Sequence, residues 1–136
     1  MAYWILKTEP STYSFADLQR EGRTVWDGVA NNTALIHIRA MQPGDEAIIY
    51  HSGDVRSAIG LARIASAPYA DPKLDDPKRA VVDVEVVRPL VQPVTLAAIK
   101  ADPLFALLGL VRLPRLSVVP VSAEQWQKLM QMAGEI

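Results

Sequence analysis

The chain has 136 residues, of which 50% are hydrophobic and 21% charged, a composition typical of a folded domain and not of a disordered segment. Its 14 lysines and arginines are balanced by 15 acidic residues, so the formal net charge is -1. This balance excludes a protein that holds nucleic acid mainly by neutralising its phosphates, because such proteins carry a large positive excess. The absence of cysteine excludes disulfides, cysteine nucleophiles and thiolate metal sites.

The N-terminal segment does not predict a signal peptide, because Lys7 and Glu9 interrupt its apolar run. The longest apolar stretch, residues 104–111, is far shorter than the roughly 18 residues that a membrane span requires. No repeat or linker-like segment divides the chain. We therefore expect a soluble, cytoplasmic protein that forms a single domain over residues 1–136.

The first third of the chain predicts a strand and two helices. Residues 3–7 are rich in strand-forming side chains. Ser14 and Asp17 have the spacing of a capping box, which predicts a short helix there. After the WDGV segment at residues 26–29, apolar residues recur at helical spacing and predict a helix over about 32–41.

The middle of the chain predicts strands separated by a surface loop. Residues 46–51 and 57–66 are apolar segments bounded by turn-forming residues. The loop at residues 68–78 contains three prolines among charged neighbours. Residues 82–87 alternate between valine and acidic positions, which is the pattern of a half-buried strand.

The last third predicts helix starts at Thr95 and at Asp102, which precedes a proline. A final strand is expected over residues 116–121, followed by a helix whose capping box is formed by Ser122 and Gln125. The elements lack the regular βαβ alternation of a parallel sheet. The fold class is therefore predicted to be α+β, with a curled and mostly antiparallel sheet.

The motifs of metal, nucleophilic and nucleotide-phosphate chemistry are missing. The two histidines, His37 and His51, lie on different predicted elements and lack the spacing of a metal site. His51 and Ser52 are neighbours in an extended strand, so their side chains point to opposite faces and cannot act as base and nucleophile together. No glycine-rich phosphate loop is present.

Aromatic and amide side chains gather near predicted turns instead. Trp26 precedes a turn, asparagines follow at residues 31–32, and residues 50–52 (Tyr-His-Ser) end a strand. An aromatic face that stacks a base, with polar groups at its edge, is what single-base recognition requires. The alternative is structural: Trp26 in the core, Asn32 as a helix N-cap and Tyr50 in cross-strand packing.

Five segments in this order resemble the EVE domain family of PUA-like proteins: YWILKTEPSTYSFADL, VWDGVANNTALIHIRAMQPGDEAIIYHSG, AIGLARIASAPYADP, VVDVEVV and RLSVVPVSAEQW. The resemblance covers nearly the whole chain. It implies a PUA-like pseudo-barrel, with a curled mixed sheet and helices packed around its ends.

The resemblance also implies a non-enzymatic reader of a modified nucleobase, related to the YTH readers, with no cofactor and no metal. The implied partner is DNA or RNA that carries a modified base, or a free modified nucleoside. The residues of the implied base pocket are Trp4, Lys7, Thr8, Glu9, Pro10, Trp26, Asp27, Gly28, Val29, Asn31, Tyr50, His51 and Ser52. Arg112 and Arg115 resemble a basic pair at its rim.

The chain departs from the family pattern after the WDGV segment. Many members have arginine where this chain has Ala30 and Leu35, and asparagine where it has Ile36. If those arginines face nucleic acid, this chain has lost phosphate or base contacts on that edge. Three outcomes are then open: a different base, a free nucleoside, or weaker binding of nucleic acid.

Two other functions compete with base reading. PUA-like folds also resemble ASCH domains, some of which hydrolyse acylated nucleosides; Lys7 or Glu9 would then be the base. The third hypothesis is a protein-interaction module with a tryptophan-rich surface.

Overall fold

The computed structural model describes residues 1–136. Its strands are β1 (Tyr3–Thr8), β2 (Arg23–Trp26), β3 (Glu46–His51), β4 (Ser57–Ile64), β5 (Tyr69–Ala70), β6 (Ala80–Thr95) and β7 (Val118–Val121). Its helices are α1 (Phe15–Glu21), α2 (Asn32–Ala40), α3 (Leu96–Lys100), α4 (Gly109–Arg112), α5 (Ala123–Met132) and a 3-10 turn (Pro103–Phe105). The prediction of an α+β fold is confirmed.

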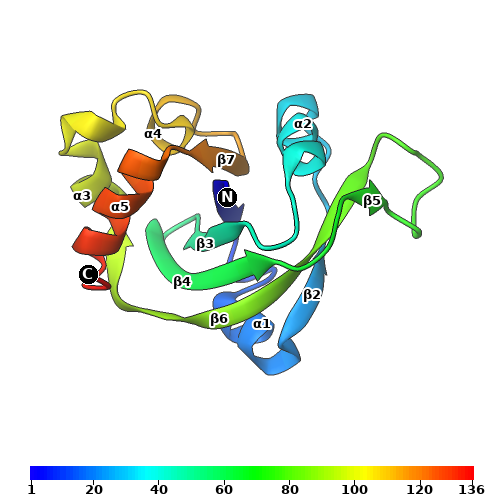
Figure 1. Cartoon of the computed structure of the whole chain (residues 1–136), viewed down its shortest axis with the longest axis horizontal. Helices are drawn as coiled ribbons and strands as arrows, with labels where there is room; N and C mark the ends of the chain where they lie inside the picture. Colours follow the sequence, from blue (N-terminus) through cyan, green and yellow to red (C-terminus); the bar gives the residue numbers. More distant parts are fainter.

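The strands form one curled sheet in the order β2-β6-β4-β3-β1-β7, and β5 pairs only with β6 (Figure 1). All pairs are antiparallel except β1 with β3. The mostly antiparallel sheet predicted from the sequence is therefore confirmed, and its parallel pair places the ends of β1 and β3 side by side.

Strand β6 is much longer than the predicted residues 82–87. It runs through Pro89 and Pro93 and curves along the whole sheet (Figure 1). Prolines cannot donate to a strand ladder, and the pairing of β6 with β4 shifts register between Ala58 and Gly60 and again after Leu61. These irregularities let one strand bend around the core.

The predicted helix starts are present. The Ser14 hydroxyl accepts a hydrogen bond from the Asp17 backbone N–H at 3.1 Å, and Ser122 does the same for Gln125 at 3.1 Å. Asp102 begins a 3-10 turn and not an α-helix. Helices α3, α4 and α5 gather on one side of the molecule, opposite the projecting β5 segment (Figure 1). None of the helices has the length and apolar composition that crossing a bilayer requires.

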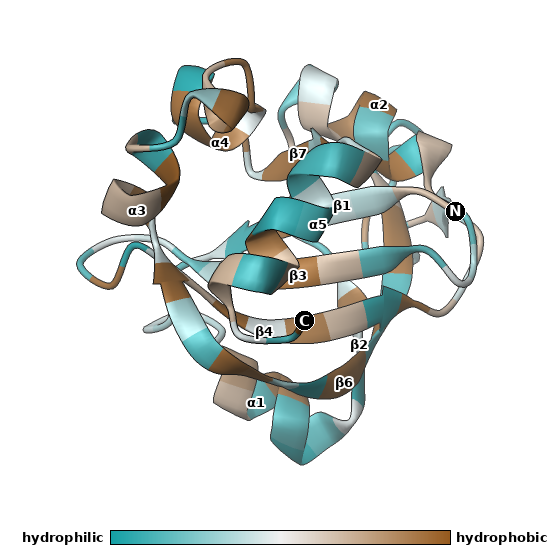
Figure 2. Cartoon of the chain, turned by 60° about the vertical axis from the view of Figure 1, so that its left-hand side comes forward, coloured by the Kyte–Doolittle hydropathy of each residue, from teal (hydrophilic) through white to brown (hydrophobic).

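A hydrophobic core of 36 buried residues fills the curled sheet. Figure 2 shows hydrophobic stretches along the strands and a largely hydrophilic exposed surface on α5. Phe15 of α1 packs directly over Gly60 of β4, where a Cβ atom would come within 2.2 Å of the ring. This contact fixes α1, and with it the loop that joins β1 to α1.

Candidate functional site

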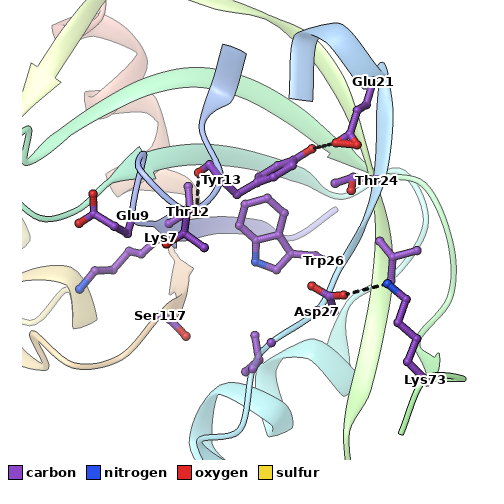
Figure 3. Close-up of a pocket in the computed structure, with 14 residues that line it drawn as sticks. Lys7, Glu9, Thr12, Tyr13, Glu21, Thr24, Trp26, Asp27, Lys73 and Ser117 are labelled. Atoms are coloured by element: carbon purple, nitrogen blue, oxygen red, sulfur yellow. Dashed lines mark hydrogen bonds and ion pairs between the residues drawn. The ribbon is translucent and has the colours of Figure 1, made fainter. Parts of the chain in front are cut away.

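A cleft of about 590 Å³ lies beside the end of β1. It is lined by Lys7, Thr8, Glu9, Thr12, Tyr13, Glu21, Thr24, Val25, Trp26, Asp27, Gly28, Val29, Lys73 and Ser117. These residues come from separate parts of the chain and meet only in the folded structure (Figure 3). The volume is in the range that small-molecule sites occupy.

Trp26 lies at the centre of the cleft (Figure 3). It ends β2, where it pairs with Val82 of β6. Gly28 follows with a φ of 75°, a left-handed conformation that lets the chain turn away at once. Only 7% of Trp26 is exposed, so the core holds most of this ring and the cleft meets a limited part of it.

Tyr13 is the second aromatic ring of the cleft. Its ring packs edge-on against Trp26, with centroids 6.0 Å apart and planes at 86°. Its hydroxyl donates to Glu21 Oε1 at 2.6 Å, and its backbone carbonyl accepts from the Thr8 hydroxyl at 2.7 Å. Burial, followed by the hydrogen bond to Glu21, raises the pKa of Tyr13 to about 12, so its hydroxyl stays neutral at physiological pH.

Lys7 forms the opposite side of the cleft (Figure 3). Its backbone N–H donates to the Ser117 carbonyl at 2.9 Å, and its ammonium donates to the Pro114 carbonyl at 2.6 Å. It takes part in no ion pair. Burial lowers the pKa of Lys7 from its ordinary value of 10.5, because the charged form loses part of its hydration.

Charged groups of both signs surround the cleft. Glu9, Glu21 and Asp27 supply carboxylates, and Lys7 and Lys73 supply ammonium groups. Asp27 Oδ2 lies 3.9 Å from Lys73 Nζ, and Glu9 accepts from the Ser11 backbone and hydroxyl. The cleft is therefore nearly balanced in charge, with one carboxylate in excess.

Seven of the predicted pocket residues line this cleft: Lys7, Thr8, Glu9, Trp26, Asp27, Gly28 and Val29. The structure places the other six outside its lining: Trp4, Pro10, Asn31, Tyr50, His51 and Ser52. Tyr13, which is not among the predicted pocket residues, supplies the second aromatic ring of the cleft, whereas the predicted Trp4 and Tyr50 do not line it. The only signal for Tyr13 in the sequence was its position as a hydrophobic staple before α1.

Three of the residues outside the lining have buried structural roles. The Trp4 indole N–H donates to Asp45 Oδ2 at 3.0 Å inside the core. Tyr50 is 2% exposed and pairs with Lys7 across β1 and β3. His51 Nε2 accepts from the Phe15 backbone N–H at 3.0 Å, and burial lowers the pKa of His51 below 6.5. His51 is thus a neutral acceptor that holds α1.

The remaining three also lie outside the lining of the cleft. Pro10 is in the turn after β1, and the Ser52 backbone N–H donates to the Thr8 carbonyl at 2.9 Å. Asn31 is the N-cap of α2, where its Oδ1 accepts from the Ala34 backbone N–H at 3.0 Å. The N-cap is therefore Asn31, and not Asn32 as the structural alternative expected.

A second depression, which we call the arginine hollow, has a volume of about 330 Å³. Its lining residues are Asn31, Thr33, Arg112, Leu113, Pro114, Arg115 and Leu116. It brings together Asn31 and the two arginines predicted at the rim, and it shares no lining residue with the cleft.

The two positions at which the chain lacks the family's arginines differ in exposure. Ala30 is exposed next to the cleft, whereas Leu35 is 2% exposed within the core. Leu35 therefore belongs to the packing of α2, whereas a longer side chain at position 30 would reach the surface beside the cleft. Ile36 is exposed.

Known proteins with sequences similar to this chain are consistent with a single family. The family model described as the EVE domain matches residues 2–132. Thymocyte nuclear protein 1 of Rattus norvegicus is 31% identical, covering 96% of this chain and 73% of its own length. The Mus musculus protein of the same name is 32% identical with the same coverage.

Solved structures share the whole fold. A protein of Rhodopseudomonas palustris has a TM-score of 0.94 and 40% identity, covering 100% of this chain and 95% of its own. The human THYN1 protein, in complex with DNA that contains 5-methylcytosine, has a TM-score of 0.88 and 29% identity over 98% of both chains. An ASCH protein of Zymomonas mobilis has a TM-score of 0.59 at 13% identity, a likeness of fold alone.

Proposed function

Because the chain belongs to the EVE domain family, we propose that it is a non-enzymatic nucleic-acid-binding protein that reads a modified base in the cleft around Trp26. The proposal includes a cytoplasmic setting and a single domain over residues 1–136. The human relative bound to 5-methylcytosine DNA supports nucleic acid as the partner and makes this base the first one to test.

The corner formed by Trp26 and Tyr13 carries the proposal. The two rings stand at 86° to each other within a cleft large enough for a small flat ligand. A base that stacks on one ring meets the other ring edge-on, and both arrangements are favourable between aromatic groups. Stacking on a protein ring typically contributes about 1–3 kcal/mol.

Polar groups around this corner are suited to the edges of a base. Thr12, Thr24 and Ser117 bring hydroxyls that can donate or accept, and Asp27 brings an acceptor. An exocyclic amine such as that of cytosine is recognised by carboxylate and hydroxyl acceptors. Lys7 is the less exposed of the two lysines that line the cleft and is suited to a carbonyl or phosphate oxygen.

The test measures binding of labelled oligonucleotides of one sequence that carry either 5-methylcytosine or cytosine at one position. Single-stranded DNA, duplex DNA and RNA versions establish the kind of strand. The informative variant is Trp26→Phe, which keeps an aromatic ring in the core but shortens the stacking surface. Trp126→Phe is the matched control, because Trp126 stacks on Tyr3 and does not line the cleft.

We expect the methylated strand to bind more tightly than the unmethylated one. This preference should decrease in Trp26→Phe and remain unchanged in Trp126→Phe. Unchanged affinity of Trp26→Phe for every strand would contradict the role of the cleft. Sustained release of acid from acylated nucleosides would contradict a non-enzymatic reader. Absence of any nucleic-acid signal, together with a captured protein partner, would favour the interaction module.

A further inference from the structure

We propose that the arginine hollow binds the sugar-phosphate of the nucleotide adjacent to the base in the cleft. The ligand of this protein is then a phosphodiester-linked strand and not a free nucleoside. This inference rests on the proposed function of the cleft. It assigns to the hollow a role of its own, as a second subsite with a different chemistry.

The first support is that the walls of the two depressions are continuous. Lys7 of the cleft donates to the carbonyl of Pro114, which lines the hollow, at 2.6 Å. Leu116 of the hollow is followed directly by Ser117 of the cleft. Consecutive Cα atoms lie about 3.8 Å apart, so a strand that leaves the cleft over this segment enters the hollow within one nucleotide.

The second support is the difference in charge. The hollow is lined by two arginines and by no carboxylate, whereas three carboxylates line the cleft. Neither Arg112 nor Arg115 takes part in an ion pair or a side-chain hydrogen bond within the protein. Both guanidinium groups are therefore available, and guanidinium binds phosphate through paired hydrogen bonds. A phosphate is favoured in the hollow and disfavoured beside Glu9, Glu21 and Asp27.

The third support is the chemistry of the remaining lining. Asn31 uses its side-chain oxygen to cap α2, which leaves its amide N–H groups as donors. Thr33 adds a hydroxyl, and Leu113 is 51% exposed beside the arginines. Donors next to an apolar surface suit the alternation of phosphate oxygens and sugar carbons along a strand.

The experiment is an NMR titration of the isotope-labelled full chain, which follows the indole N–H of Trp26 and the backbone signals of residues 112–116. The probes are 5-methyldeoxycytidine and two dinucleotides that place a thymidine on its 3′ or its 5′ side. The variant is Arg112→Gln/Arg115→Gln. The matched control is Arg63→Gln, an exposed arginine of β4 that takes part in no ion pair and lies outside both depressions.

We expect at least one dinucleotide to bind about tenfold more tightly than the nucleoside, the usual scale of one charge-assisted contact. The double variant should lose this gain and keep its affinity for the nucleoside, and Arg63→Gln should change neither. Equal binding of nucleoside and dinucleotides by the wild type would overturn the inference while leaving base reading intact, and so would equal weakening of both ligands in the double variant. If no probe shifts the Trp26 signal, the proposed function itself fails, and the inference fails with it.

Discussion

The cleft around Trp26 and the arginine hollow are neighbours, but their side chains are held in opposite ways. In the cleft, the Tyr13 hydroxyl donates a hydrogen bond to Glu21, and the Lys7 ammonium donates one to the Pro114 carbonyl. The Trp26 ring is buried in the core. In the hollow, Arg112 and Arg115 are exposed and have no partner within the protein. A fixed site favours selectivity, because little freedom is lost when a ligand of the right shape enters. Exposed, unpaired cations favour affinity for any strand, because they contact the phosphates and not the bases.

The difference between the cleft and the arginine hollow also bears on the near-zero net charge of the chain. A chain with a net charge of -1 does not attract phosphates over its whole surface. It instead places two unpaired arginines beside a cleft whose own charges are nearly balanced. Selectivity and strand affinity are then separable by mutation.

The largest expected difference between the two regions is in how much a mutation lowers the free energy of unfolding. Trp26→Ala should lower the free energy of unfolding by about 3–5 kcal/mol, since it leaves a large cavity in the core. Urea unfolding followed by circular dichroism measures this loss. A loss below about 1 kcal/mol would show that the ring is not part of the core. The side chains of the cleft would then be no more firmly held than those of the arginine hollow.

His51→Gln tests the support under the cleft and should cost about 1–3 kcal/mol, because the buried Phe15 N–H loses a well-placed acceptor. Burial lowers the pKa of His51 below 6.5. The unfolded chain therefore binds a proton at higher pH than the folded chain, and stability falls as pH drops below about 6.5. Comparing unfolding midpoints near pH 7 and pH 5 should show a weaker pH dependence in the variant. Part of the dependence should remain, because burial also lowers the pKa of His37.

Tyr13→Phe removes only the hydroxyl that fixes the second ring, and we expect a loss of about 0.5–1.5 kcal/mol. The pKa of Tyr13 is raised from 10.0 to about 12. The stability that comes from its neutral form is complete below pH 10 and is lost as pH rises through 12. Alkaline unfolding of the variant should be less steep. The remaining dependence should come from Tyr69, whose pKa is also raised to about 12, and from Tyr50, whose pKa is raised by burial. An unchanged alkaline profile would show that the hydroxyl is not held in the fold.

Arg112→Gln/Arg115→Gln should change stability by less than about 0.5 kcal/mol, because both residues are exposed and unpaired. Its effect should be on salt dependence. Each phosphate contact on single-stranded nucleic acid contributes about 0.7 to the slope of log affinity against log salt. The variant should lose roughly 1.4 of this slope if each arginine holds one phosphate. An unchanged slope would show that neither arginine contacts a phosphate of the bound strand.

Local signals were enough to predict most of the fold. The capping boxes at Ser14 and Ser122, and the apolar segment at residues 46–51, were predicted where they occur. Strand β2 was missed because its four residues form a strand only by pairing with β6, about 60 residues away in sequence. The prolines of β6 concealed its length because their effect depends on bulges formed with β4.

The residues of the cleft were harder to predict than the fold, because they meet through contacts between segments that are distant in sequence. Trp4 and Trp26 are both buried tryptophans on strands, yet the partner of Trp4 is Asp45, which is distant in sequence and is brought beside Trp4 by the pairing of β1 with β3. Tyr50 was predicted in the pocket because it lies at the end of a strand beside His51, whereas the structure buries it. The contact between Tyr13 and Trp26 depends on how α1 docks through Phe15 on Gly60, and no spacing within one segment encodes it.

The central claim is that the cleft selects the base and the arginine hollow holds the strand. The most direct test is the ratio of affinities for a 5-methylcytosine strand and its unmethylated counterpart, measured by fluorescence anisotropy at one fixed salt concentration. We predict that Arg112→Gln/Arg115→Gln weakens binding of both strands and leaves the ratio unchanged, while Trp26→Phe brings the ratio toward one. A ratio that follows the arginines and ignores Trp26 would contradict the account.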